Sequence, residues 1–195
     1  MKNIVILLTI GLSSILGVNA QSTWEIEPSH AKIGFAIAHF GISETEGKFH
    51  QYKGTVVTSK EDFSDAQIEL AIAVSSIDTE NEQRDTHLKG EDFFEVEKYP
   101  EITFKSKELK ALGNNKYKLI GEFNMHGVVK TIELDAEYRG TVKDPWGNTK
   151  AGFLVTGELN REDYGLTWNT VLEAGGLAVG KEVELECNLE LIKKS

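Results

Sequence analysis

The side chains best suited to polar chemistry gather in one stretch of the chain. Arg84, Asp85 and His87 fall within four residues, and the aromatic residues Phe93 and Phe94 follow closely. A guanidinium offers a planar, permanently charged fork for a phosphate or carboxylate. An imidazole can hydrogen-bond a carbonyl or transfer a proton. The same side chains could instead form ion pairs that fix a short helix, so the sequence leaves a binding role and a structural role open.

Three further residues could contact a ligand. His39 continues the apolar face of a predicted strand, and Trp168 could either stack on a ligand or anchor a loop. Cys187 interrupts an aliphatic strand face. Its neighbours Glu186 and Asn188 offer no positive charge that would activate a thiol, so Cys187 is predicted to be a buried structural residue.

The sequence lacks the motifs of common enzyme and metal sites. Its five histidines form no helical pair and no compact ligand cluster, so no metal site is predicted. It contains no G-x-S-x-G, no C-x-x-C, no P-loop and no dinucleotide fingerprint. We therefore predict no catalytic residues, no cofactor and no enzymatic activity.

A period of two dominates the chain and must position these residues. The run from Val183 to Leu191 reads V-E-L-E-C-N-L-E-L, with apolar residues and Cys187 on one face and polar residues on the other. The run from Gln67 to Ser75 alternates in the same way. This alternation is typical of β-strands with one dry face and one wet face.

Seven or eight such runs are separated by turn signals such as Gly113-Asn114-Asn115. They predict an antiparallel sandwich or barrel, and the pattern alone does not separate a packed interior from a hollow one. One helix is predicted, from Thr79 to Lys89, capped by Asp78 or Thr79. It would be a short insertion between strands.

The N-terminal residues resemble an export signal. Lys2 precedes an apolar run from Ile4 to Leu16, and Val18-Asn19-Ala20 fits a cleavage site. We predict that residues 1–20 are removed and that residues 21–195 form one domain. Loss of Lys2 changes the formal charge from −10 to −11, which argues against nucleic acid or an anionic membrane surface as a partner.

A series of short motifs, in order, resembles one known family. They comprise His30-Ala31-Lys32-Ile33-Gly34-Phe35, Ala38-His39-Phe40-Gly41, Gly47-Lys48-Phe49, Ile77-Asp78-Thr79, Arg84-Asp85-Thr86-His87-Leu88-Lys89, Asp92-Phe93-Phe94, Lys98-Tyr99-Pro100, Thr103-Phe104, His126-Gly127-Val128-Val129-Lys130, Asp144-Pro145-Trp146-Gly147, Ala151-Gly152-Phe153, Arg161 and Asp163-Tyr164-Gly165-Leu166. Together they resemble the YceI-like family of exported bacterial lipid-binding proteins. One departure is Val129 and Thr131, where the family often has Thr and Pro.

The resemblance implies an all-β fold, an antiparallel lipocalin-like barrel that encloses an apolar pore. It implies a periplasmic protein that holds a polyisoprenoid, such as an isoprenoid quinone or prenyl phosphate, for transport or storage. Partners would be this lipid, transiently a membrane or a lipid-delivering protein, and a second copy in a homodimer. The alternatives are a fatty acid or fatty amide as the ligand, or an enzyme acting on such lipids through Arg84, Asp85 and His87.

Binding of an apolar tail needs walls of branched and aromatic side chains, with polar groups only at the head. The residues predicted to contact the ligand are Phe35, Ile37, His39, Leu70, Ile72, Arg84, His87, Phe104, Phe123, Phe153, Trp168, Leu185 and Cys187.

Overall fold

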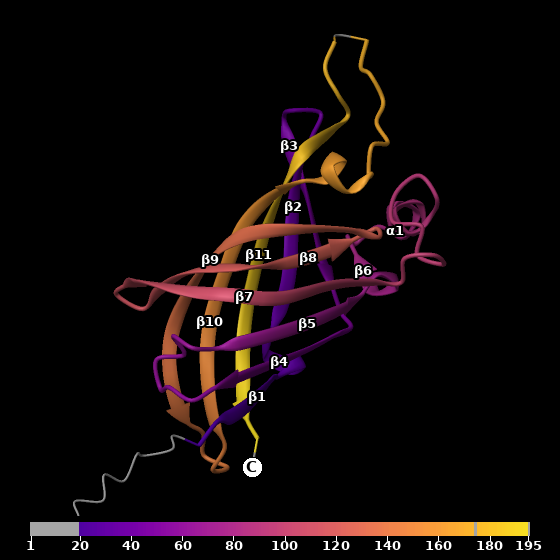
Figure 1. Cartoon of the computed structure of the whole chain (residues 1–195). Helices are drawn as coiled ribbons and strands as arrows, with labels where there is room; N and C mark the ends of the chain where they lie inside the picture. The colour runs from indigo at the N-terminus through magenta and orange to yellow at the C-terminus, as the bar shows by residue number, and fades with distance from the viewer. Residues whose placement is uncertain (1–19, 174, 195) are drawn as a thin grey trace, which may run out of the picture.

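The computed structural model describes residues 20–173 and 175–194 of the chain (Figure 1). Within these ranges the chain is built mainly from β-strands, with a single α-helix, α1 (Glu82–Lys89). The strands are β1 (Ser22–Ile26), β2 (Lys32–His39), β3 (Ser43–Phe49), β4 (Tyr52–Thr58), β5 (Gln67–Ala73), β6 (Ile77–Asp78), β7 (Glu101–Gly113), β8 (Lys116–Met125), β9 (Val128–Lys143), β10 (Thr149–Asn160) and β11 (Val179–Lys193). Three short 3-10 helices are η1 (Pro28–His30), η2 (Val74–Ser76) and η3 (Arg161–Tyr164).

Eight of the described strands close into an antiparallel barrel. Their order around the ring is β1, β4, β5, β7, β8, β9, β10 and β11, and the pairing of β1 with β11 closes it. Trp24 in β1 lies opposite Lys193 on one side and Val56 on the other. Closure removes the exposed edges that an open sheet would present. The predicted antiparallel barrel, with a short helical insertion between strands, is confirmed.

The long strand β11 has two successive neighbours on one side. Its last residues pair with β1, while its first part pairs with β2, where Leu185 lies opposite Phe35 and Cys187 opposite Ile33. β3 pairs with β2, and β6 pairs with the end of β3. These three strands extend the barrel wall beside the upper half of β11 (Figure 1).

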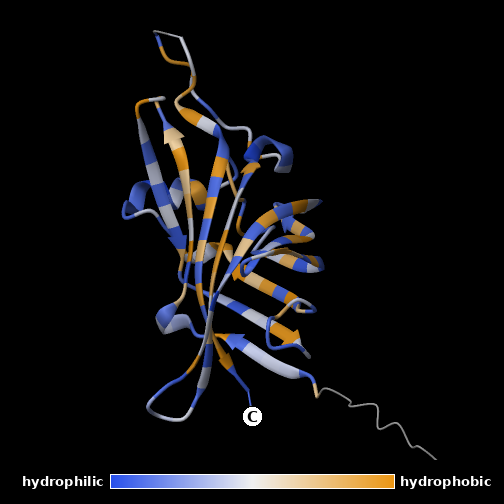
Figure 2. Cartoon of the chain, turned by 90° about the vertical axis from the view of Figure 1, so that its left-hand side faces the viewer, coloured by the Kyte–Doolittle hydropathy of each residue, from blue (hydrophilic) through white to orange (hydrophobic). Residues whose placement is uncertain are grey.

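The alternating pattern determines which side chains face inward. Val155 in β10 lies opposite Cys187 in β11, and Cys187 lies opposite Ile33 in β2, so these residues belong to one face across three strands. Bands of hydrophobic and hydrophilic residues alternate along the strands (Figure 2). A one-residue shift in register would turn every inward side chain outward, so this alternation fixes the pairing.

The predicted helix is correct in type but begins too early. The observed helix, α1, starts at Glu82. Its N-cap is Asn81, whose side-chain oxygen accepts a hydrogen bond from the backbone N–H of Arg84 at 3.0 Å. Asn81 itself has an extended backbone, with φ of −148°. The predicted caps Asp78 and Thr79 therefore lie before the helix, because Asn81 supplies the hydrogen bond that its first turn needs.

The predicted strand from Gln67 to Ser75 is also slightly too long, since β5 ends at Ala73 and Val74 begins a 3-10 turn. The predicted signal peptide falls almost wholly on residues 1–19, which lie outside the described residues. Among the described helices, none has the length and apolar character needed to cross a membrane.

Candidate functional site

The barrel encloses a cavity of about 210 Å³ with an apolar wall. The wall is built from the inward faces of the strands. Nine of the thirteen residues predicted to contact a ligand line this cavity, namely Phe35, Ile37, Leu70, Ile72, Phe104, Phe123, Phe153, Leu185 and Cys187. The hollow interior follows from the closed ring of eight strands, which leaves room for one ligand when the inward side chains do not fill it.

One end of the cavity is closed by an aromatic plug. Phe63, in the connection between β4 and β5, is 2% exposed and lines the cavity. Its ring centroid lies 5.1 Å from that of Trp24, 5.4 Å from that of Tyr138 and 5.0 Å from that of Phe153. Aromatic packing of this kind excludes water from the end of the barrel.

Hydrogen bonds hold the connection that carries Phe63. The carboxylate of Asp65 accepts hydrogen bonds from the hydroxyls of Ser59 and Thr58, both at 2.5 Å, and from the backbone N–H of Ser59 at 3.1 Å. These bonds favour the ionised form and lower the pKa of Asp65 below its usual value. The hydroxyl of Tyr117 also donates to the carbonyl of Asp62 at 2.5 Å. The plug is therefore tied to the barrel on both sides of Phe63.

The opposite end is covered by the segment that contains α1. β5 runs from the Phe63 connection toward η2, β6 and α1, so the plug and the helix lie at opposite ends of that strand. Figure 1 shows α1 beside the ends of the barrel strands. Leu88, Phe93 and Phe94 from this segment line the cavity. The segment that contains α1 therefore contributes to the wall at this end of the barrel.

The segment that contains α1 and covers this end of the barrel is called the cap below. Arg84 and Asp85 hold it in place through their hydrogen bonds to Thr79. Arg84 donates from Nε to Oγ1 of Thr79 at 2.8 Å and from Nη2 to the carbonyl of Thr79 at 2.7 Å. The carboxylate of Asp85 accepts from Oγ1 and from the backbone N–H of Thr79, at 2.6 and 2.9 Å. Arg84 is exposed and does not line the cavity. These contacts support a structural role for Arg84.

The other three predicted polar or aromatic contacts also lie outside the cavity wall. His87 hydrogen-bonds Asp92 through Nε2 at 3.0 Å, and its ring packs edge-on against Trp168, with centroids 5.0 Å apart. His39 stacks on Phe40 near the tip of the β2–β3 hairpin, with centroids 3.8 Å apart. Direct contact of these residues with a ligand stays a prediction.

The placement of the cap also bears on the enzymatic alternative. That hypothesis assigned Arg84, Asp85 and His87 as acid–base and oxyanion groups. Arg84 and Asp85 bond Thr79, His87 bonds Asp92, and none of the three lines the cavity. A reacting group held in the cavity would not meet them, which disfavours this mechanism.

Cys187 borders the cavity from β11. Burial raises the pKa of its thiol to about 11, although the backbone N–H of Gly34 partly offsets this effect. The thiol is therefore protonated at neutral pH and a poor nucleophile. This agrees with the prediction of a structural rather than a reactive cysteine.

Arg161 is the residue that the sequence reasoning missed. It begins η3, is 3% exposed and lines the cavity. Its Nε donates to the carbonyl of Gly180 at 2.8 Å, and its Nη1 donates to the carbonyl of Leu166. Its Nη2 is buried without a hydrogen-bond partner among the described residues. Burial lowers the pKa of the guanidinium, with a smaller opposing effect of Glu162.

His126 shows that Arg161 lies at the cap end. The ring of His126, in the β8–β9 turn, lies 4.4 Å from that of Tyr99, which follows α1 in the chain. Its Nδ1 lies 3.0 Å from the carbonyl of Tyr164 in η3, an acceptor that places the proton on Nδ1. His126 thus joins η3, where Arg161 begins, to the segment that covers the barrel.

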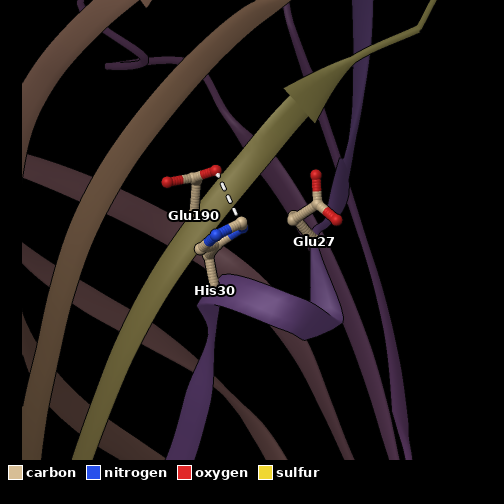
Figure 3. Close-up of side chains that lie close together, drawn as sticks. All are labelled: Glu27, His30 and Glu190. Carbon is tan, nitrogen blue, oxygen red and sulfur yellow. Dashed lines mark ion pairs between the residues drawn. The ribbon is translucent and has the colours of Figure 1, made fainter.

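One cluster could hold a metal ion on donor type alone. Glu27, His30 and Glu190 lie close together near η1, with His30 Nδ1 3.6 Å from Glu190 Oε1 (Figure 3). Lys150 also reaches this cluster, with Nζ 3.2 Å from Glu27 Oε2 and 2.7 Å from Glu190 Oε1. Glu190 and then Glu27 raise the pKa of Lys150, so its ammonium already supplies the positive charge. We assign the cluster as an ion-pair network.

The chain is similar to known proteins along nearly its whole length. The model of the YceI-like domain matches residues 24–191. A UPF0312 protein of Staphylococcus aureus (strain N315) is 36% identical over 171 residues, which cover 87% of this chain and 97% of that protein.

Solved structures of other proteins also resemble this chain. The Campylobacter jejuni YCEI protein is 32% identical, with a TM-score of 0.69 over 82% of this chain and 91% of that one. A polyisoprenoid binding domain from Saccharophagus degradans shares the fold, with a TM-score of 0.63 at 15% identity, over 88% of this chain and 98% of that one. The chain belongs to the YceI-like family.

Proposed function

We propose that this protein holds the apolar tail of a long-chain amphiphile, a polyisoprenoid such as an isoprenoid quinone or prenyl phosphate, inside its barrel. The observation that carries the proposal is the apolar cavity, plugged at one end by Phe63 and capped at the other by Leu88, Phe93 and Phe94. Burial of a hydrocarbon tail is favourable by roughly 25 cal/mol per Å². Because nearly all of the lining side chains are apolar, the tail can leave water while few polar wall groups lose a hydrogen-bond partner.

The choice of lipid class has further support in the family. The Saccharophagus degradans structure with this fold is described as a polyisoprenoid binding domain. Branched prenyl units suit a wall that mixes aromatic and β-branched side chains, such as Phe123 and Ile72.

The size of the cavity sets a condition on binding. Its volume of about 210 Å³ lies below the roughly 300–1,000 Å³ of typical ligand sites. A long tail therefore needs partly buried side chains of the cap, such as Leu88 and Phe94, to move aside. The cap is well placed for this movement, because α1 itself contains no buried residue.

We further propose that the protein is exported and carries or stores its lipid in the periplasm. The support is the N-terminal run of Ile4 to Leu16 followed by Val18-Asn19-Ala20. Mass measurement of the protein from a periplasmic fraction should give a chain that begins at Gln21. An intact N-terminus in the membrane fraction would instead indicate an anchored protein. A homodimer and contact with a membrane or delivery protein stay predictions.

Native mass spectrometry of the gently purified protein, followed by organic extraction, tests the proposed ligand. We expect an adduct whose mass matches a prenyl lipid and which disappears on denaturation. The control is Phe123→Trp, which fills the cavity and should be isolated without the adduct. A wild-type protein that carries no lipid and takes up none from vesicles containing prenyl lipids would contradict the proposal.

A further inference from the structure

The cavity wall contains one buried cationic group. Arg161 is 3% exposed, and its side chain borders a cavity whose other lining side chains are almost all apolar. Glu69 also borders the cavity, but its side chain is 67% exposed and its carboxylate pairs with Lys105 at 2.8 Å. A buried charge next to an apolar space is costly unless it gains a partner.

Within the described residues, Arg161 forms no ion pair. Its two polar contacts are the carbonyls of Gly180, bonded through Nε, and Leu166, bonded through Nη1. The nearest acidic neighbour in the chain, Glu162, is paired with Lys181 at 2.8 Å. Nη2 is buried without a partner. Arg161 therefore lacks both one acceptor and one negative charge.

A ligand head that bears one compact anionic acceptor would supply both. Nε and one N–H of Nη1 are already bonded to carbonyls, so the fork formed by Nε and Nη2 is not available, and Nη2 is the nitrogen that has no partner. A phosphate would leave several oxygens facing an apolar wall, each at a desolvation cost. A carboxylate has only two oxygens, so fewer acceptor sites would be left facing the apolar wall.

The geometry points to Arg161 as the residue that selects the head group, by binding a long-chain carboxylate through Nη2. This inference rests on the proposed binding of an apolar tail in the cavity and assigns a different head group, a carboxylate in place of a quinone or phosphate. Arg161 lies at the cap end and Phe63 at the opposite end. The carboxylate would thus sit under the cap, with the tail directed toward the plug. The tail could be prenyl or acyl, since Arg161 would contact only the head group.

The test compares ligands with one prenyl tail and different heads, namely farnesoic acid, farnesyl phosphate and the hydrocarbon farnesene. We expect wild-type protein to bind farnesoic acid roughly ten- to a hundredfold more tightly than farnesene, the range for a hydrogen bond to a charged group. Farnesyl phosphate should bind more weakly than the acid. Dodecanoic acid, measured in parallel, distinguishes an acyl tail from a prenyl one.

The matched variants are Arg161→Gln and Arg84→Gln. Arg161→Gln should abolish the preference for the acid while binding of farnesene persists. Arg84→Gln should keep the preference, since Arg84 is exposed and bonds Thr79 outside the cavity wall. Arg161 also bonds two carbonyls, so Arg161→Gln could fail to fold. In that case, the order of the ligand affinities measured on the wild-type protein tests the assignment. Arg161→Lys tests it as well, because this variant keeps the charge and should retain part of the preference for the acid.

The outcomes separate this inference from the proposed function. Equal binding of acid and hydrocarbon by the wild-type protein, or tightest binding of the phosphate, overturns the assignment of Arg161 but leaves tail binding intact. Failure to bind any of the ligands overturns both. A preference for the acid that survives in Arg161→Gln shows that another residue selects the head.

Discussion

Phe63 and Arg161 border the same cavity from opposite ends of the barrel. Phe63 closes its end with aromatic rings and offers no polar group, whereas Arg161 brings a buried guanidinium to the capped end. Among the residues that line the cavity, the one buried charged side chain therefore lies at the capped end. An amphiphile has the same asymmetry, so the barrel should take up its ligand in one orientation.

Filling the cavity with a larger side chain should abolish lipid uptake. Phe123→Trp and Leu70→Trp add volume to inward positions, at a cost of about 1–3 kcal/mol for overpacking. We expect the variants to keep their far-UV circular dichroism and to take up no lipid from labelled vesicles. The matched control is Val129→Trp, at an outward position 58% exposed, which should bind normally. Undiminished uptake by both inward variants would rule out a tail inside the barrel.

Removing the aromatic plug should destabilise the protein. Phe63→Ala deletes a ring that is 2% exposed and contacts Trp24, Tyr138 and Phe153. A change of this kind costs about 3–5 kcal/mol, which for a domain of this size lowers the melting temperature by roughly 10 °C. Calorimetry measures the shift. Trp146→Ala, at a side chain 82% exposed, is the control and should change stability by less than about 0.5 kcal/mol.

The sequence predicted the wall of the site well. Residues such as Phe35, Phe104 and Leu185 lie on alternating strand faces, and alternation alone decides which of them face the interior. A period of two carries this information locally, without knowledge of which strands pair. The helical insertion between strands was predicted for a similar reason, because it breaks the strand period.

The polar part of the site could not be derived in this way. Arg84 and Arg161 are both arginines next to acidic residues in the sequence, yet Arg84 is exposed and Arg161 is buried. The buried Arg161, in η3, donates to the carbonyls of Gly180 and Leu166, and Gly180 lies in β11, which is distant in the sequence. Only its place among the family-like motifs singled it out in the sequence. The start of α1 was also misjudged, because several residues before it could have served as caps.

Acidification should remove the stabilising effect of Asp65. Hydrogen bonds from Ser59 and then Thr58 lower its pKa below the usual 3.8 in the folded protein. A lowered folded pKa means that the ionised carboxylate stabilises the fold above the unfolded pKa, and that this stability is lost as the pH falls below it. Asp65→Asn should therefore unfold at lower urea concentration than the wild type at neutral pH. The difference should shrink below about pH 4.

The control for this prediction removes a donor and keeps the carboxylate. Ser59→Ala leaves Asp65 with its bond from Thr58, so the same pH dependence should appear with smaller amplitude. Urea unfolding at a series of pH values measures all three proteins. A difference between wild type and Asp65→Asn that stays constant across this range would show that the carboxylate's charge contributes nothing.

Cys187 should report whether the cavity is occupied. It is the one cysteine of the chain, it lines the cavity, and burial raises its pKa to about 11. Because the thiolate is the reactive form, we expect slow maleimide labelling at neutral pH and fast labelling after denaturation. A bound tail would lie against the sulfur, so saturating lipid should slow labelling further. In a Cys187→Ser background, Ser43→Cys places a thiol at an exposed position and should react at the same rate with and without lipid. If lipid binds but leaves the labelling rate of Cys187 unchanged, the tail does not occupy the cavity beside β11.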